Sequence, residues 1–470
     1  LVLVIDLFVS QEKRIITYWL TMATLAATAF MVAFNSPESG SLIFSGSYVS
    51  DELSVLLKLV SIVSTAVVIL YSRDYLIDND LFKGEFFVLI LFGLLGIMIM
   101  ISANSMLVMY LGLETLALSL YALVALDRNS SIAAESAMKY FILGAIASGS
   151  LLYGISWVYG VTGSLEFNEI ANAIQANPEI NALPLWFGMA FVIVGIAFKF
   201  GAVPFHMWLP DTYEGAPPTI TALLAAGTKK AGFAAALRIV IMGTVALNLD
   251  WTLALGIIAV MTMTVGNIAA VLQKNLVRML AYSSIGHAGY ILIGISVAPF
   301  SGMGLQASLF HILNHAVMKG AAFIAVAGIV TTLAITHLDK LKGLGRKMPI
   351  TALGLVISLL ALAGVPPLNG FWSKLMLFGA SIDAGSALWW APWLAVAGVL
   401  NSALSLAYYG WIIRKMYFEG ETEKRVKEPA SIIGVMIFSI IFMVTIGVYP
   451  EPIIKFAEMA SPVLTGTLMP

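Results

Sequence analysis

The 470-residue chain contains no cysteine, and only 11% of its residues are charged. Without cysteine thiolates the chain cannot form disulfides or hold an iron–sulfur cluster in the usual way. It contains no P-loop and no glycine-rich fingerprint for dinucleotides. Its formal net charge of −1 gives no indication of a nucleic-acid partner. Any redox or ATP chemistry must therefore be carried by another polypeptide.

Hydrophobic residues make up 60% of the chain, and apolar runs of about 20 residues recur along it. Backbone polar groups in lipid must be satisfied within the segment, so these runs should be helices. Period-two alternation, which is typical of transmembrane β-strands, is not seen. We predict an all-α polytopic membrane protein of about fourteen transmembrane helices, with residues 1–470 forming one membrane domain.

The expected spans can be placed from the apolar runs. They are 14–34, 54–72, 85–103, 106–126, 133–160, 184–204, 217–241, 250–271, 275–296, 302–332, 350–381, 387–413 and 430–449. Residues 1–9 are too short to span, and we interpret them as the end of a first helix, with a cleaved signal peptide as the alternative. The 161–183 loop contains an amphipathic stretch, 165–174, that we expect on the outer surface.

Basic residues predict the orientation, because loops rich in lysine and arginine stay in the cytoplasm. One set of alternate loops and their flanks holds most of the 25 basic residues, and the opposite set holds only Lys455. The first set comprises Lys13, Arg14, Arg73, Lys83, Arg128, Lys274, Arg278, Lys340, Lys342, Arg346, Lys347, Arg414, Lys415, Lys424, Arg425 and Lys427. We therefore expect both termini and the 161–183 loop on the outer side.

Two long apolar segments contain prolines at comparable depth, each close to a lysine. Pro204 lies in segment 198–206, which holds Lys199, and Pro366 and Pro367 lie in 363–374, which ends with Lys374. Proline removes a backbone donor and opens or kinks the helix. Paired interruptions of this kind often mark inverted repeats with a transport path between them. The alternative is a pair of ordinary proline kinks.

Several ionisable residues fall inside the expected spans. Glu114 lies about midway along its span, where an unpaired charge costs several kcal/mol. Lys199 lies beside the first break, and Lys229 and Lys230 lie roughly 18 Å into the following helix. Successive residues point about 100° apart, so only one of the latter two should face a common axis. The alternative role for this group is buried ion pairing that fixes helix packing.

A second group is spaced at helical intervals. His311, His315 and Lys319 are four residues apart and share one helix face, which suits a proton relay or, alternatively, a polar stripe between helices. Lys139 lies four residues after Glu135, so a simple i,i+4 pair and a functional role both remain open. Lys58 and Arg238 lie near helix ends, where we expect their side chains to reach the interface.

Several motifs together resemble those of the antiporter-like membrane subunits of respiratory complex I. They are 112–114 (GLE), 198–199 (FK), 204–211 (PFHMWLPD), 215–217 (GAP), 281–287 (AYSSIGH) and 364–371 (GVPPLNGF). Segment 159–165 (YGVTGSL) is similar to the N-type of these subunits. The resemblance covers nearly the whole chain, and the combination of motifs is specific.

The resemblance implies a fold of fourteen helices with two inverted five-helix repeats, helices 4–8 at 85–241 and helices 9–13 at 250–413. It implies that Glu114 pairs with Lys199, that Lys229 is the connecting lysine, and that Lys374 serves the second broken helix. The His311, His315 and Lys319 face resembles the L- and M-types more closely. This favours, as an alternative, a subunit of a multi-subunit Na⁺/H⁺ antiporter or a membrane-bound hydrogenase.

The resemblance further implies a proton-translocating subunit of a NADH:quinone oxidoreductase in the bacterial inner membrane. Its partners would be the other membrane and peripheral subunits of complex I and the lipid bilayer. No cofactor is expected in this chain, while FMN, iron–sulfur clusters and quinone are expected on other subunits. An independent secondary transporter and a structural spacer are the remaining alternatives.

Overall fold

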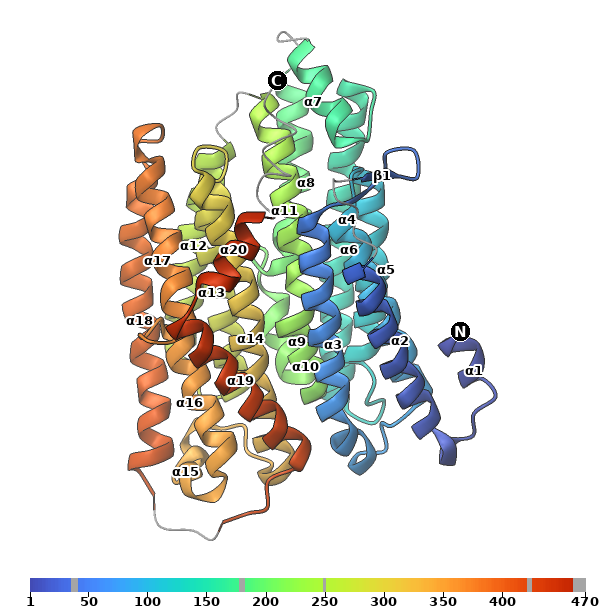
Figure 1. Cartoon of the computed structure of the whole chain (residues 1–470), viewed down its shortest axis with the longest axis vertical. Helices are drawn as coiled ribbons and strands as arrows, with labels where there is room; N and C mark the ends of the chain where they lie inside the picture. Colours follow the sequence, from blue (N-terminus) through green and yellow to red (C-terminus); the bar gives the residue numbers. More distant parts are fainter. Residues whose placement is uncertain (35–40, 177–181, 248–250, 421–424, 460–470) are drawn as a thin grey trace.

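The computed structural model describes residues 1–34, 41–176, 182–247, 251–420 and 425–459, and it is almost entirely helical (Figure 1). Within these residues, eleven helices are long and apolar enough to cross a membrane. A short antiparallel hairpin, β1 (Ser41–Ile43) with β2 (Tyr48–Ser50), precedes the second of them. The prediction of an all-α polytopic membrane protein is confirmed. Lys424, one of the basic residues used for the orientation, lies outside the described residues.

The long helices follow the predicted apolar runs. They are α2 (Ile15–Phe34), α3 (Glu52–Asp78), α4 (Gly84–Ser102), α5 (Met106–Val124), α6 (Ser131–Thr162), α8 (Ala182–Phe200), α12 (Trp251–Val271), α13 (Leu276–Val297), α14 (Gly302–Leu333), α18 (Ala391–Phe418) and α19 (Ala430–Val448). The largest differences are at the C-terminal ends of α3 and α18, which extend beyond the apolar runs into polar residues. Figure 1 shows α2 to α6 on one side, α12 to α18 on the other, and α8 to α11 between them.

Short elements complete the chain. They are α1 (Val2–Asp6), η1 (Gln11–Lys13), α7 (Phe167–Ala176), η3 (Leu338–Leu341), α15 (Leu344–Lys347), η4 (Ala384–Ser386) and α20 (Glu451–Met459). The predicted amphipathic stretch is helix α7, which buries Phe167, Ile170 and Ile174 along one face. Helices α7 and α15 lie at opposite ends of the bundle (Figure 1).

Two of the expected spans are interrupted at the predicted places. Helix α8 ends at Phe200 and is followed, after a loop, by the short helix α9 (Trp208–Gly215). Likewise α16 (Pro349–Ala363) is followed by α17 (Asn369–Asp383). Gly201 and Gly364, the residues after α8 and α16, have φ of 76° and 87°. Glycine adopts this left-handed conformation without steric cost, so each half-helix can end inside the bundle.

A third irregularity was not predicted. The expected span 217–241 consists of α10 (Pro218–Leu223), a π-helical turn η2 (Leu224–Thr228) and α11 (Lys229–Leu247). A π turn inserts one extra residue and rotates the helix that continues from it, and such turns are frequent at functional sites. Here the π turn ends immediately before Lys229.

The expectation for Arg238 and Lys58 is wrong, because both side chains are buried within the protein and bind protein groups. Arg238 is 2% exposed, and its guanidinium donates to both carboxylate oxygens of Asp51, at 3.0 and 2.9 Å. The same guanidinium donates to the Ile101 carbonyl at 2.8 Å. Lys58 is buried and donates to the hydroxyl of Tyr48 at 2.9 Å. Both cations have partners in or next to the β hairpin, and the partner of Arg238 is 187 residues away in the sequence.

Candidate functional site

Eight ionisable side chains, all buried except the partly exposed Glu114, lie on α5, α8, α11, α13, α14 and α17. We call this set the polar axis, and define it as Glu114, Lys199, Lys229, His287, His311, His315, Lys319 and Lys374. The lysines are between 0% and 5% exposed, and the histidines are equally buried. Ionisable residues at this depth are costly, so they usually pair, contact backbone carbonyls or meet water.

Glu114 and Lys199 lie at the α5 and α8 end of the polar axis. The Ser148 hydroxyl of α6 donates a hydrogen bond to the Glu114 carboxylate. Lys199 is buried in the last turn of α8 and interacts electrostatically with Glu114. Among the described residues, no ion pair within 4.0 Å joins the two. The pair implied by the resemblance is therefore an interaction at a distance, with Ser148 holding the carboxylate.

Lys229 and Lys230 point to different neighbours. Lys229 Nζ donates to the Ser284 carbonyl of α13 at 3.2 Å and lies 5.9 Å from the centre of the Tyr213 ring. Lys230 Nζ instead donates to the Ser64 hydroxyl of α3 at 2.7 Å. The separation in direction follows from the 100° step between successive helical residues. Lys229 is the member of the pair that faces the polar axis.

Helix α14 supplies the central part of the axis. Lys319 Nζ donates to the Ser283 hydroxyl at 2.6 Å and to the Leu280 carbonyl at 3.1 Å, both on α13. Ser283 in turn shares a hydrogen bond with the Tyr409 hydroxyl of α18. His315 interacts electrostatically with Lys229 and Lys319. The face predicted from the four-residue spacing thus lies against α13 and beside Lys229.

The histidines extend the axis to the second break. His287 Nδ1 and His311 Nε2 are hydrogen-bonded at 3.3 Å, and their rings are stacked. His311 Nδ1 and the Ser373 hydroxyl are 2.9 Å apart. Both nitrogens of His311 are thereby engaged, one on each side of the ring. An imidazole bonded on both sides can take a proton at one nitrogen and release it at the other.

Lys374 occupies the second break itself. Its Nζ donates to the Ala363 carbonyl at 3.1 Å and to the Ser402 hydroxyl at 2.8 Å. Ala363 is the last residue of α16, so its carbonyl lacks a helical donor. The ammonium also lies 4.6 Å from the centre of the Tyr290 ring. The break therefore provides the oxygen that binds this lysine.

Several buried polar atoms along the axis have no hydrogen-bond partner within the described part of the chain. Among them are Tyr213 Oη, Ser284 Oγ, His287 Nε2 and His315 Nε2. Polar groups buried in this way are where folded proteins hydrogen-bond internal water. They lie beside Lys229 and between the lysines of the axis, where a proton would need carriers.

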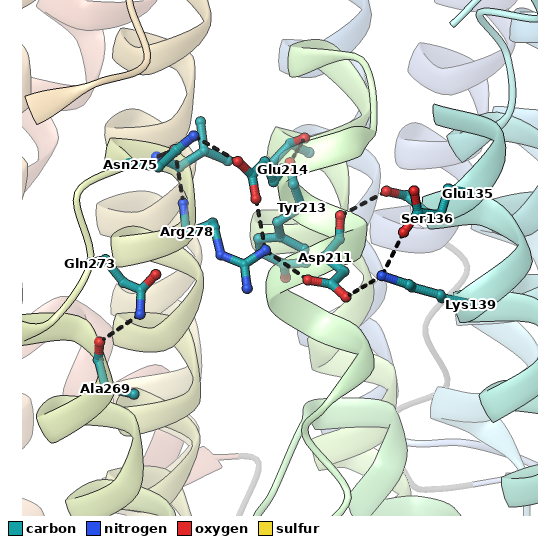
Figure 2. Close-up of polar contacts among 12 residues, drawn as sticks. Glu135, Ser136, Lys139, Asp211, Tyr213, Glu214, Ala269, Gln273, Asn275 and Arg278 are labelled. Carbon is teal, nitrogen blue, oxygen red and sulfur yellow. Dashed lines mark hydrogen bonds and ion pairs between the residues drawn. The ribbon is translucent and has the colours of Figure 1, made fainter. Parts of the chain in front are cut away.

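Lys139 lies outside the polar axis. Its side chain is 47% exposed, and it pairs with Glu135 at 2.8 Å and with Asp211 of α9 at 3.0 Å (Figure 2). We call this group, which also includes Glu214 and Arg278, the α9 charge cluster. The i,i+4 pair was foreseen from spacing, whereas the partner 72 residues away was not.

Sequence reasoning did not select the hydroxyl groups that connect the axis. These hydroxyl groups belong to residues that look ordinary in apolar helices: Ser148, Ser283, Ser373 and Tyr409. Only their contacts in the fold, with Glu114, Lys319 and His311 among others, distinguish them. His287 ends the 281–287 motif that carries the resemblance, but the sequence assigned it no role. No group of three or more histidine, aspartate or glutamate side chains within the described ranges is arranged to hold a metal ion.

Residues 103–405 match the protein family described as NADH:quinone oxidoreductase/Mrp antiporter, TM. The chain is 42% identical over 466 residues to the NADH-quinone oxidoreductase subunit N of Thiobacillus denitrificans, covering 98% of this chain and 94% of that protein. It is also 42% identical over 466 residues to the subunit of the same name from Thioalkalivibrio sulfidiphilus, covering 98% and 95%.

Solved structures with the same fold come from several membrane complexes. A chain of respiratory complex I from Thermus thermophilus has a TM-score of 0.79 and 28% identity, with 97% of this chain and 96% of that chain covered. A chain of the archaeal membrane-bound sulfane sulfur reductase has a TM-score of 0.87 and 30% identity, covering 98% and 94%. A chain of the Mrp complex from Dietzia has a TM-score of 0.83 at 22% identity, covering 96% and 92%.

Proposed function

The chain belongs to the NADH:quinone oxidoreductase/Mrp antiporter membrane family, and from that premise we propose that it is subunit N of a bacterial NADH:quinone oxidoreductase. It is an antiporter-like membrane subunit of respiratory complex I, and its partners are the other subunits of that complex and the lipid bilayer. Its role is proton translocation. The observation that carries this role is the polar axis, which places buried lysines on both broken helices and, between them, a hydrogen-bonded series from His287 through His311 to Ser373.

Two inverted repeats, 85–241 and 250–413, account for the order of the helices. Helices α4, α5 and α6 precede the broken pair α8 and α9, just as α12, α13 and α14 precede the broken pair α16 and α17. The third helix in each series, α6 or α14, has 32 residues. An odd offset of five spans would give the two repeats opposite topology, which is the arrangement that supports alternating access in transporters. The full count of fourteen helices is part of this proposal.

The mechanism depends on charges that influence one another in a poorly solvated interior. A buried lysine is costly when charged, so a nearby charge or hydrogen-bond acceptor decides whether it keeps its proton. Protonation of Lys229 affects His315 and Lys319 electrostatically, and His287 and His311 lead from there to Ser373 beside Lys374. A shift of charge at Lys199, governed by Glu114, would thus be passed along the axis. The driving energy would come from quinone reduction elsewhere in the assembly.

Redox chemistry is assigned to other subunits. The sequence offers no cysteine for iron–sulfur ligation and no dinucleotide fingerprint. We therefore place FMN, the iron–sulfur clusters and quinone outside this chain, which acts as the translocating part of the enzyme.

Lys374→Ala tests this function in the assembled complex. Removing the ammonium interrupts the axis at the second break, so proton uptake per quinone reduced should fall by about tenfold or more, since a positioned proton-transfer group typically contributes roughly 10²–10⁴-fold. The measurement is quinone-driven proton uptake in vesicles, with subunit content checked by immunoblot. Lys340→Ala is the control, because Lys340 is an exposed lysine outside the axis. Wild-type uptake in an assembled Lys374→Ala complex would refute the proposal.

A subunit of a multi-subunit Na⁺/H⁺ antiporter or membrane-bound hydrogenase is the second candidate. Its support is that the family description also names the Mrp antiporter and that a chain of another membrane complex, the archaeal sulfane sulfur reductase, is 30% identical to this chain. The 42% identity to the subunit N proteins favours the first candidate. The native assembly separates them: NADH:quinone reductase activity in the purified complex supports the first candidate, and Na⁺-dependent proton exchange without it supports the second.

The proposed orientation in the bacterial inner membrane places both termini outside. Asn129→Cys and Lys340→Cys, at exposed loop positions, should be labelled by a membrane-impermeant thiol reagent only in inside-out vesicles. Gln175→Cys, exposed on α7, should be labelled only in right-side-out vesicles. The chain has no cysteine of its own, so any label found on this subunit after it is separated from the others must be at the introduced position. The reverse pattern would overturn the orientation.

A further inference from the structure

The α9 charge cluster joins α9 to helices on both of its sides (Figure 2). The Asp211 carboxylate accepts from Lys139 of α6 at 3.0 Å and from Arg278 of α13 at 2.7 Å. Arg278 also donates to Glu214 at 2.7 Å, and Asn275 donates to the other Glu214 oxygen at 2.9 Å. Two carboxylates on one short helix thus bind cations from the first and the second proposed repeat.

Helix α9 depends on such contacts for its position. It contains 8 residues and stands between the break after α8 and the Ala216–Pro217 junction with α10. A helix this short is unstable without tertiary support. On its apolar side the Trp208 ring stacks on Tyr140 of α6, with centroids 4.4 Å apart. On its polar side the support comes from the charge cluster.

Tyr213 connects α9 to the polar axis. It lies between Asp211 and Glu214 in sequence but is buried, with its ring centre 5.9 Å from Lys229 Nζ. The Tyr213 carbonyl accepts from the Thr221 hydroxyl of α10 at 2.8 Å. A displacement of α9 would therefore change the surroundings of Lys229.

We infer that the α9 charge cluster forms a clamp, by which we mean a salt-sensitive set of ion pairs that fixes α9 between the two halves of the bundle. Asp211 is then a positioning residue for proton transfer at Lys229. The transport consequence rests on the proposed function, whereas the clamp itself does not. The cluster side chains are roughly one quarter to two thirds exposed, so salt can screen their attraction. Salt would not weaken apolar packing, such as that of Trp208 on Tyr140, by screening.

Thiol labelling at position 216 tests the clamp directly. Ala216 is buried at the end of α9, so Ala216→Cys should react slowly in the assembled complex. Adding Asp211→Asn or Arg278→Gln should raise the labelling rate by about tenfold, because α9 would open locally more often. Raising salt toward 1 M, where the Debye length is about 3 Å, should raise the rate in the parent, and should raise it less in Asp211→Asn, which keeps, of the ion pairs to α9, only Arg278–Glu214.

Matched variants separate charge from bulk. Glu135→Gln removes a cluster carboxylate that contacts Lys139 but not α9, so labelling should stay within about twofold of the parent. Asp211→Glu and Arg278→Lys keep the charges and should restore slow labelling and proton uptake. Labelling of the Asp211→Asn variant at the parent rate would overturn the clamp.

Proton uptake per quinone reduced gives the second measurement. It should fall several-fold in Asp211→Asn and Arg278→Gln together with the rise in labelling. Faster labelling with unchanged uptake would overturn the positioning role. If the unsubstituted complex moved no protons, the proposed function would fail, while the labelling rates would still decide whether the clamp exists.

Discussion

Lys229→Ala should reduce proton uptake coupled to quinone reduction by on the order of tenfold or more, whereas Lys230→Ala should cost less than about twofold. The two lysines are adjacent and equally buried, so composition and depth cannot separate them. Their partners do. Lys229 binds the Ser284 carbonyl beside the polar axis, while Lys230 binds the Ser64 hydroxyl on α3.

After loss of Lys230, the neighbouring Ser64 hydroxyl still has a hydrogen-bond partner. The Ser64 hydroxyl already donates to the Val60 carbonyl at 2.7 Å, so Lys230→Ala creates little unpaired polar surface. Loss of Lys229 removes the charge that acts most strongly on both His315 and Lys319, whereas Lys230 acts less strongly and on His315 alone of these two. Uptake in vesicles, normalised to quinone reduction and subunit content, distinguishes the variants. Equal losses in fully assembled complexes would show that the difference in direction has no functional meaning.

Lys199→Arg should also stop proton uptake, although it preserves the positive charge. Arginine stays protonated under all physiological conditions, so it cannot alternate between charged and neutral forms. A purely structural ion pair would give the opposite result, since arginine would maintain it. We expect a loss of about tenfold or more in an assembled complex. Uptake at the wild-type rate in assembled Lys199→Arg would exclude a relay role for this lysine.

The carboxylate partner gives a graded series. Glu114→Gln removes the negative charge that favours the protonated form of Lys199, so the relay should stall. Glu114→Asp keeps the charge with a shorter reach and should retain part of the activity. Ser148→Ala is a useful companion, because Ser148 donates to Glu114 without carrying charge. Its effect should be smaller than that of Glu114→Gln.

The arrangement of the membrane helices could be predicted because apolar length and proline position are local properties. Every long helix falls on a predicted apolar run, and both breaks lie at the expected prolines. The π turn before Lys229 was not predictable, since residues 224–228 have no composition that separates a π turn from an α turn. Spacing showed that Lys229 and Lys230 diverge, and only the fold could show which one faces α13.

The candidate site was predictable to the extent that burying a charge in lipid is rare. That argument selected Glu114 and Lys199 from the sequence, whereas Lys374 was selected by its place beside the second proline break. The structure gives all three polar neighbours. The argument failed for Arg238, whose partner Asp51 lies 187 residues away. It left Lys139 undecided for the same reason, because the partner from α9 is distant in sequence. The depth of a residue in the membrane can be predicted from the apolar segment around it. An ion-pair partner that is distant in the sequence cannot.

The interruptions of the two spanning helices have an electrical consequence. A helix that ends inside the bundle brings its dipole with it, equivalent to roughly half a negative charge at the C-terminal end. Lys199 lies in the last turn of α8, and Lys374 donates to the last carbonyl of α16. Each lysine therefore meets a fixed negative pole that proton binding cannot neutralise, as it would neutralise a carboxylate. A lysine held in this way can lose and regain its proton repeatedly against a constant counter-field.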